Sequence, residues 1–255
     1  MRLLLLGLLL GCALGALAKT TTLVLQEHLG REWAPEVLTY PFSATKAERV
    51  RTDSLRVTAD GARLPAQLIE VTYWPGTPHV QSATLALVSG LPARTTKTFT
   101  VTTGGKAAPA TTSDLRVTGG VDTVEVQTSK FGLRLLLGEK TYLEPQAADD
   151  VPGPVLAMRL PDGRWFGASR MYGARKISGY AATMTEQGSA LARWQARYRY
   201  ADGGTLEITI DLGAGLARAL WSTRVTGQDL EGGWKLALSP GLEPLSLAWR
   251  PEYQH

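Results

Sequence analysis

The sequence predicts an all-β protein with two successive units, a small β-barrel or sandwich followed by a larger antiparallel β-sandwich. Short segments of alternating apolar and polar residues recur along the chain, which is the pattern of half-buried strands. No segment after residue 19 has a long apolar stripe at helical spacing. The 27 glycines and 14 prolines among 255 residues provide the turns that many short strands require.

Composition and charge exclude several classes of protein. With 44% hydrophobic and 20% charged residues, the chain is neither a disordered tail, nor a collagen-like fibre, nor a multi-pass membrane protein. The 27 lysines and arginines exceed the 23 aspartates and glutamates by only four. Basic residues do not cluster with aromatic ones, so we expect no nucleic-acid partner.

The N-terminus predicts export. Arg2 precedes an apolar run over residues 3–17, and Ala16-Leu17-Ala18 is a small-x-small cleavage signal, so residues 1–18 have the pattern of a secretory signal peptide. The run is shorter than the ~20 residues of a membrane-spanning helix. We therefore expect a secreted or periplasmic protein.

The single cysteine, Cys12, leaves a second route of export open. Residues 9–12, Leu-Leu-Gly-Cys, resemble a bacterial lipobox, in which the cysteine is lipidated and anchors the protein at the cell envelope. If the signal peptide is instead cleaved after Ala18, Cys12 is an ordinary small residue that is removed with it, and no thiol remains for a disulfide. This lipid anchor is the one membrane contact that the sequence predicts.

The strand-like segments fall into two groups. The first group, within residues 19–103, has alternating segments at 23–26, 37–42, 55–58, 64–73, 80–88 and 98–101. Residues 104–113 lack periodicity and large apolar residues, which is typical of a linker. The second group occupies residues 114–255 and is predicted to form the larger sandwich.

A first hairpin is predicted at Asp60-Gly61. Both residues tolerate the positive φ angles of a two-residue type I′ turn. This turn pairs Val57 with Leu64 and Leu55 with Ala66, which keeps apolar residues on one face. Pro65 then falls opposite Arg56, and because proline cannot donate to the ladder, we expect an edge strand or a bulge there.

A second hairpin is predicted over residues 192–212. A three-residue loop with a glycine in the left-handed position matches the apolar faces of the two strands, because a one-residue slip would reverse every side chain. Trp194 and Tyr198 then point into the core, while Arg193, Arg197 and Arg199 point outward. The expected pairs are Tyr200 with Leu206, Tyr198 with Ile208, Ala196 with Ile210, Trp194 with Leu212 and Arg199 with Glu207.

The search for catalytic chemistry assigns no catalytic residue, metal or cofactor. The three histidines, His28, His79 and His255, do not pair at metal-ligand spacing. No nucleophile elbow, phosphate-binding loop or kinase signature is present. Carboxylates are available for acid–base hydrolysis, but their spacing does not predict that any two converge.

Aromatic residues suggest a binding surface. Tryptophan and tyrosine total 15 against four phenylalanines, and such amphipathic rings can lie flat against sugar faces while their polar ends reach hydroxyls. Trp165, Arg170 and Tyr172 lie together in the glycine-rich stretch 163–173, which makes them candidate sugar-binding residues. In the alternative, Trp165 packs beneath a hairpin.

The outward arginines of the second hairpin are the other candidates. Arg193 and Arg197 have the chemistry to hold the carboxylates of an anionic polysaccharide through charge-assisted hydrogen bonds. In the alternative, which is the commoner outcome, these arginines form a cross-strand ladder with Glu207 and its neighbours.

Several short motifs resemble a known family. In residues 21–103 the motifs are Ser54-Leu55-Arg56-Val57, Leu64-Pro65-Ala66-Gln67, Ala83-Thr84-Leu85-Ala86-Leu87-Val88 and Thr96-Lys97-Thr98-Phe99-Thr100-Val101. In the second unit they are Ser129-Lys130-Phe131-Gly132-Leu133-Arg134-Leu135, Gly153-Pro154-Val155 and Tyr200-Ala201-Asp202-Gly203-Gly204. Together they resemble the N-terminal β modules of bacterial secreted exo-rhamnogalacturonan lyase-like proteins.

This resemblance implies a small β-barrel, then a β-sandwich similar to the galactose-mutarotase-like supersandwich, then a helical toroid. The toroid closes the substrate cleft in that family and has no counterpart in this sequence, so lyase activity does not transfer. Mutarotase chemistry depends on histidine and glutamate, and residues 114–254 contain no histidine. We expect either a fragment of a longer carbohydrate-active protein or a stand-alone binding module.

The function expected from these observations is that of an exported, non-catalytic β-module protein that binds or positions a polysaccharide or oligosaccharide, with an acidic, pectin-like glycan as one candidate. Two alternatives stay open. One is a polysaccharide lyase or glycosidase with an unrecognised site, and the other is a structural module between domains. The sequence leaves the oligomeric state open.

Overall fold

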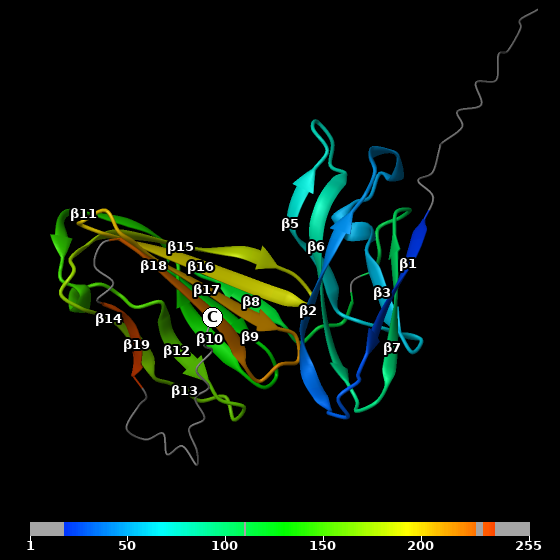
Figure 1. Cartoon of the computed structure of the whole chain (residues 1–255). Helices are drawn as coiled ribbons and strands as arrows, with labels where there is room; N and C mark the ends of the chain where they lie inside the picture. The colour runs from blue at the N-terminus through cyan, green and yellow to red at the C-terminus, as the bar shows by residue number, and fades with distance from the viewer. Residues whose placement is uncertain (1–17, 110, 228–231, 238–255) are drawn as a thin grey trace, which may run out of the picture.

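The computed structural model describes residues 18–109, 111–227 and 232–237 (Figure 1). These residues form strands and three short 3-10 helices, and every pair of neighbouring strands is antiparallel. The predicted all-β class is therefore confirmed. The signal peptide and the lipobox at Cys12 lie outside the described residues, except for Ala18.

The N-terminal unit is a sandwich of two sheets, and its described strands do not close into a barrel. The β7 sheet has the order β1 (Lys19–Gln26), β7 (Thr96–Thr103), β3 (Arg56–Ala59) and β4 (Ala62–Arg63). The β6 sheet has the order β2 (Trp33–Ser43), β6 (Val80–Leu91) and β5 (Ala66–Tyr73). Two 3-10 helices, η1 (Lys46–Glu48) and η2 (Thr52–Ser54), join β2 to β3.

The first predicted hairpin is confirmed at its turn and corrected beyond it. Asp60 and Gly61 have φ angles of 52° and 76°, as a type I′ turn requires. The Leu64 N–H donates to the Val57 carbonyl at 2.9 Å. The pairing of Leu55 with Ala66 is wrong, because the chain leaves the β7 sheet at Pro65 and Ala66 pairs with Leu87 of β6. Pro65 therefore follows the edge strand β4, which ends at Arg63, and the missing N–H leaves no gap in a ladder.

The C-terminal unit is a larger sandwich. The β10 sheet has the order β13 (Trp165–Phe166), β12 (Val155–Arg159), β10 (Gly132–Leu136), β9 (Thr123–Gln127) and β8 (Arg116–Gly119). The β16 sheet has the order β11 (Gly138–Gln146), β15 (Ile177–Gln187), β16 (Leu191–Tyr200), β17 (Thr205–Gly213) and β18 (Ala219–Thr226). A two-stranded sheet joins β14 (Ala168–Tyr172) to β19 (Gly233–Ala237), and η3 (Ala148–Asp150) precedes β12.

The core of this larger sandwich lies between the β10 and β16 sheets. Trp194 and Tyr198 are fully buried there, as predicted, and both polar atoms have partners. The Trp194 indole N–H donates to the Leu136 carbonyl at 2.7 Å, and the Tyr198 hydroxyl donates to the Pro152 carbonyl at 3.0 Å. Burial of two large aromatic rings with satisfied polar atoms stabilises the contact between the sheets.

The second predicted hairpin has the expected loop and faces but a different register. The Tyr200 N–H donates to the Gly204 carbonyl, so the loop is three residues long, and Gly203 has the left-handed φ of 87°. Tyr198 lies opposite Leu206 rather than Ile208, and Arg199 lies opposite Thr205 rather than Glu207. The expected pairs are displaced by two residues, and a displacement of two keeps every side chain on its predicted face.

The two units contact each other where β5 and β6 meet the start of β16. Ile69, Ala86 and Leu191 form a small buried apolar cluster at this junction. The Gln67 side-chain oxygen accepts the N–H groups of Ala190 at 3.0 Å and of Leu191 at 2.9 Å. Within residues 104–113, the Gly104 and Ala108 N–H groups donate to η2 residues at 3.0 and 2.7 Å. The chain between the units is thus partly tied to the first of them.

Candidate ligand-binding pocket of the N-terminal sandwich

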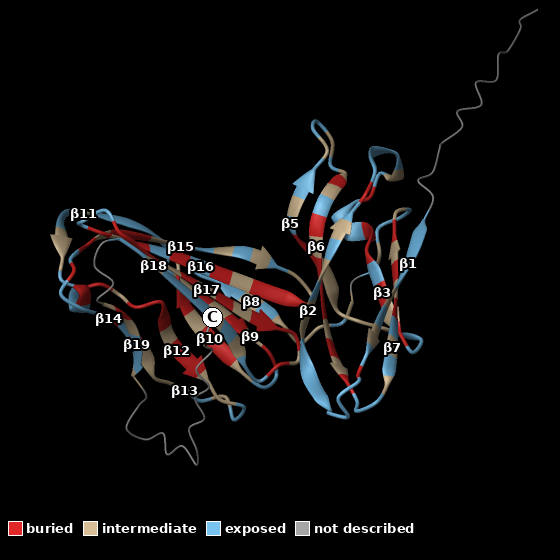
Figure 2. Ribbon diagram, in the orientation of Figure 1, coloured by how far each residue is buried: buried red, intermediate tan, exposed pale blue. Residues whose placement is uncertain are grey.

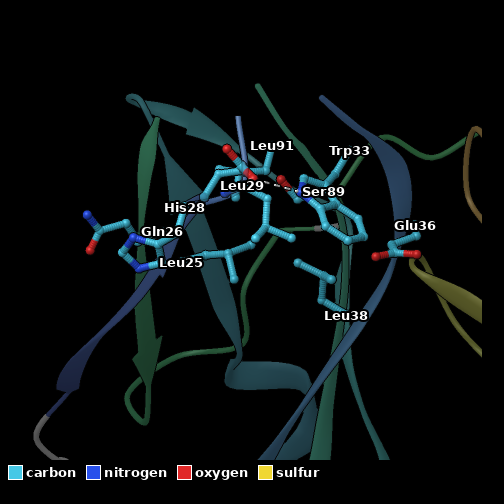
Figure 3. A pocket seen from close by; sticks show the side chains of 10 residues that line it. Leu25, Gln26, His28, Leu29, Trp33, Glu36, Leu38, Ser89 and Leu91 are labelled. Carbon is cyan, nitrogen blue, oxygen red and sulfur yellow. Dashed lines mark hydrogen bonds between the residues drawn. The ribbon is translucent and has the colours of Figure 1, made fainter. Parts of the chain in front are cut away.

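A pocket of about 440 Å³ opens between the edge strands β1 and β2 of the N-terminal sandwich (Figure 3). Neither strand contains a buried residue, and Figure 2 shows both in the colours of exposed and intermediate residues. The core of the sandwich is therefore accessible along this side. The residues that line the pocket are Leu25, Gln26, Glu27, His28, Leu29, Trp33, Glu36, Leu38, Ser89 and Leu91.

A β-bulge in β2 directs two of these side chains to the same pocket. Trp33 pairs with Leu91 and Glu36 pairs with Ser89, so two residues of β2 lie opposite the single residue Gly90. In strict alternation, residues 33 and 36 would point to opposite faces. The extra residue of the bulge changes this alternation, and both Trp33 and Glu36 line the pocket.

The bulge depends on Pro35 and Gly90. Pro35 needs no ladder partner on an edge strand, which suits it to a bulge. A Cβ atom at residue 90 would lie 2.9 Å from the Trp33 carbonyl oxygen and 3.2 Å from the Pro35 nitrogen. Glycine is therefore required for this close approach of the two backbones. Arg218 of the C-terminal unit donates to the Pro35 carbonyl at 3.2 Å and supports the bulge from outside.

Glu27 organises the loop that leads from β1 to the pocket mouth. One carboxylate oxygen accepts the Leu29 N–H at 2.7 Å and the Trp33 indole N–H at 3.4 Å. The other accepts the N–H groups of Gly30 and Arg94, each at 2.8 Å. The backbone N–H of Arg94, and then those of Leu29 and Arg31, hold the pKa of the Glu27 carboxyl at about 2, because each hydrogen bond favours the charged form.

Trp33 is the largest side chain in the lining of the pocket. It remains 46% exposed, although its indole N–H is held by Glu27. Its ring is thus oriented by the protein while part of its surface stays in water. A ring held in this way is prepared to stack on a ligand without first losing rotational freedom.

The wall of the pocket is aliphatic. Leu25 and Leu38 project from the two edge strands, Leu29 comes from the intervening loop, and Leu91 ends β6. Leu29 is 71% exposed, so much of its apolar surface is in contact with water. A second hollow of about 220 Å³ follows the same strands and includes Leu23, Tyr40 and Phe42 in its lining.

Polar groups lie at the two ends of this apolar wall. In Figure 3, Gln26 and His28 lie at one end and Glu36 at the other, with the leucines between them. Glu36 has one ion-pair partner at longer range, the Arg218 guanidinium, whose nitrogen is 3.8 Å from the Glu36 carboxylate. The pocket therefore offers an aromatic ring, an aliphatic wall and hydrogen-bonding groups at both ends.

The candidates from the glycine-rich stretch 163–173 are Trp165, Arg170 and Tyr172. They lie in the C-terminal unit, on two different sheets. Trp165 belongs to β13, at the edge of the β10 sheet, and the Arg134 guanidinium lies 4.7 Å from its ring centroid. Arg170 and Tyr172 are exposed on β14, with the Lys235 ammonium 5.6 Å from the tyrosine ring. Sugar binding by these residues stays a prediction.

The arginine candidates lie on the outer face of the β16 sheet. Arg193 binds Asp211 through two hydrogen bonds of 2.8 and 2.9 Å, and it binds Glu70 of the N-terminal unit at 2.6 Å. Arg197 is 3.6 Å from Glu207 and stays exposed. The cross-strand ladder considered as the alternative is therefore present. Trp165, Arg170, Tyr172, Arg193 and Arg197 are distributed over three sheets.

The sequence prediction missed Trp33, Glu27 and Glu36. A usable signal was present in Trp33-Ala34-Pro35, where a proline interrupts the approach to an alternating strand and marks an edge or a bulge. The carboxylate of Glu27 gave no such signal, because its partners Gly30 and Arg94 meet it only in the folded chain.

Comparisons with known proteins identify no family for this chain. No protein-family model matches the sequence, and no curated protein matches it. Among the residues that the structure describes, no group of histidine, cysteine, aspartate and glutamate is arranged to hold a metal ion. The described part of the chain also contains no helix long and apolar enough to span a membrane.

Proposed function

We propose that this chain is an exported, non-catalytic β-module protein that binds a polysaccharide or oligosaccharide, and that the pocket beside Trp33 is its binding site. The observation that supports this most directly is the half-exposed Trp33 ring, which Glu27 orients at the mouth of a 440 Å³ pocket. This volume lies within the range of pockets that bind small molecules, about 300–1,000 Å³.

The chemistry of the pocket suits a sugar residue. The ring of Trp33 provides a flat surface for the C–H face of a sugar, as amphipathic aromatic rings do at wet interfaces. Gln26, His28 and Glu36 provide donors and acceptors for hydroxyl groups around that face. The side of the pocket is open between two strands, so a sugar unit can enter while the rest of a polymer stays in solvent.

Glu27 is not suited to act as the general acid of a glycoside hydrolase. A glycoside hydrolase needs a carboxylic acid that is protonated near neutral pH. The hydrogen bonds to Glu27 lower its pKa to about 2, so this carboxyl is ionised and cannot donate a proton to a leaving group. Its role is to hold the loop and the Trp33 ring.

Affinity electrophoresis tests this proposal. Wild-type protein without residues 1–18 is run through gels that contain pectic, uronic or neutral glycans, beside Trp33→Ala and Trp33→Phe. We expect retardation of the wild type on at least one glycan, a loss of at least ten-fold in affinity for Trp33→Ala, and partial retention for Trp33→Phe.

Trp221→Ala is the matched control, because Trp221 is also a tryptophan that is only partly buried, but it lies on β18 of the other unit and stacks on Trp234. Its affinity should equal that of wild type. Equal retardation of Trp33→Ala and wild type would contradict the assignment of the site, and absence of retardation on every glycan would contradict the function.

A further inference from the structure

The charged groups that line the Trp33 pocket are carboxylates. Glu27 and Glu36 both contribute to the lining, and no lysine or arginine among the described residues does. The nearest guanidinium that pairs with either side chain is that of Arg218, at 3.8 Å from Glu36 and largely exposed to solvent. The guanidinium of Arg94 lies beside the loop, against Gly30, but Arg94 does not line the pocket. A ligand inside the pocket therefore meets carboxylates as the charged side chains of the lining.

Glu27 contributes its charge to this field but no free hydrogen-bonding capacity. Each of its two oxygens already accepts two N–H groups, from Leu29 and Trp33 on one side and from Gly30 and Arg94 on the other. A carboxylate has about four acceptor sites in all. A sugar hydroxyl consequently finds no acceptor at Glu27, and the described lining offers a ligand carboxylate no lysine or arginine.

The aliphatic wall selects for a different kind of group. Leu25, Leu29, Leu38 and Leu91 surround the space beneath Trp33, and they offer no hydrogen bond to a hydroxyl or carboxylate. A polar substituent that is forced against them loses its water without compensation. A methyl group in the same place removes apolar surface from water, which favours binding.

We propose that the Trp33 pocket takes a neutral sugar unit whose substituent ends in a methyl group, and that it rejects the corresponding free uronate. A methyl ester, an acetyl ester and the methyl group of a deoxy sugar share this chemistry. The inference rests on the proposed function and specifies its ligand. It differs from the acidic glycan that the arginine-rich hairpin suggested, because that glycan requires cationic partners which this pocket lacks.

The decisive measurement is a pair of titrations with one polymer in two forms. Fully methyl-esterified oligogalacturonide and the same material after saponification are titrated calorimetrically into wild-type protein at equal ionic strength. We expect the ester to bind at least ten-fold more tightly than the acid. An acetylated and a deacetylated neutral oligosaccharide form the second pair, which distinguishes an acetyl group from a methyl ester as the source of the methyl.

Two variants separate the charge effect from the apolar effect. Glu36→Gln removes one carboxylate, so the ratio of the affinity for the ester to the affinity for the saponified form should fall several-fold. Leu29→Asn replaces an exposed residue of the pocket wall, so folding is preserved. It should lower the affinity for the ester several-fold and have little effect on the affinity for unsubstituted neutral sugars.

The outcomes distinguish this inference from the proposed function. Equal affinity for substituted and unsubstituted forms, or tighter binding of the free acid, would overturn the inference and leave glycan binding intact. Binding of the acid that is lost in Trp33→Ala but persists in Arg197→Ala would also overturn it, because the pocket would then accept the free uronate. Absence of binding to every form would remove the inference and the function together.

Discussion

Trp33 and Trp194 show how differently the two sandwiches use the same residue. Both indole N–H groups have protein acceptors, the Glu27 carboxylate for Trp33 and the Leu136 carbonyl for Trp194. Trp194 is 0% exposed, within a core that two five-stranded sheets enclose, whereas Trp33 is 46% exposed at the open edge of the smaller sandwich. Burial makes one ring a source of stability, and exposure leaves the other available to a ligand.

The arginines of β16 show a similar contrast within one strand. Arg193 and Arg197 lie on the same face, four residues apart. The side chain of Arg193 is 18% exposed, because the N-terminal unit covers it and supplies Glu70 as a partner. The side chain of Arg197 is 59% exposed and is 3.6 Å from Glu207. Position in the fold, rather than residue type, decides which arginine is structural.

The largest expected effect is the loss of the buried ring. Trp194→Ala should lower the free energy of unfolding by about 3–5 kcal/mol, the range for a large aromatic residue removed from a packed core. Trp33→Ala should change it by less than about 1 kcal/mol, because nearly half of that side chain is already in water. Urea unfolding of both variants beside wild type measures the difference, and similar losses would contradict the contrast between the two units.

The next effect concerns the contact between the units. Arg193→Ala leaves the Asp211 and Glu70 carboxylates without their shared partner and should destabilise the protein by about 1.5–3 kcal/mol, the range for hydrogen bonds to charged groups. Arg193→Lys keeps the charge but loses the two-pronged contact with Asp211, so an intermediate loss is expected. Urea unfolding with a probe in each unit measures this loss, and an unchanged transition for Arg193→Ala would show that the ion pairs do not stabilise the junction.

A local, pH-dependent effect is expected at the pocket. The folded-state pKa of Glu27 is about 2, below its ordinary value of 4.5, so its stabilisation of the loop is fully present above pH 4.5 and is lost as the pH falls toward 2. The amide resonances of Leu29 and Gly30 and the indole resonance of Trp33 should shift together over that interval. In Glu27→Gln this titration should be absent, whereas Glu36→Gln, the matched control, should keep it. A common midpoint near pH 4.5 would contradict the lowered pKa.

The smallest effect is expected for the exposed arginine. Arg197→Ala should cost about 0–1 kcal/mol, because a solvent-exposed ion pair contributes little to stability. Urea unfolding beside Arg193→Ala provides the comparison. A loss for Arg197→Ala as large as that for Arg193→Ala would mean that the cover provided by the N-terminal unit does not distinguish the two arginines.

Much of the fold could be predicted from local sequence. The Asp60-Gly61 turn and the loop that ends at Gly203 follow from the φ angles that glycine and aspartate tolerate. The faces of β16 and β17 follow from strict alternation, which is why Trp194 and Tyr198 were correctly placed in the core. The register of that hairpin follows from the three-residue loop 201–203, which sets Tyr200 opposite Gly204. The expected pair of Tyr200 with Leu206 encloses five residues, so it is displaced by two although every face is preserved.

The candidate site could not be predicted in the same way. Its parts come from β1, β2, the end of β6 and the loop between the first two strands, and Arg94 reaches Glu27 from 67 residues away. The residues that the sequence did suggest, Trp165, Arg170, Tyr172, Arg193 and Arg197, are close only in sequence or on one strand. Folding distributes them over three sheets.

The sequence by itself determined the all-β class, the turn chemistry and the inward faces of the longest strands, because these depend on residues a few positions apart. Only the tertiary structure decided that the edge of the first sandwich stays open, that a bulge opposite Gly90 brings Trp33 and Glu36 together, and that Arg193 is covered by the other unit. Those features depend on which edges and faces of separate segments meet in space, and alternation within a strand contains no information about its distant neighbours.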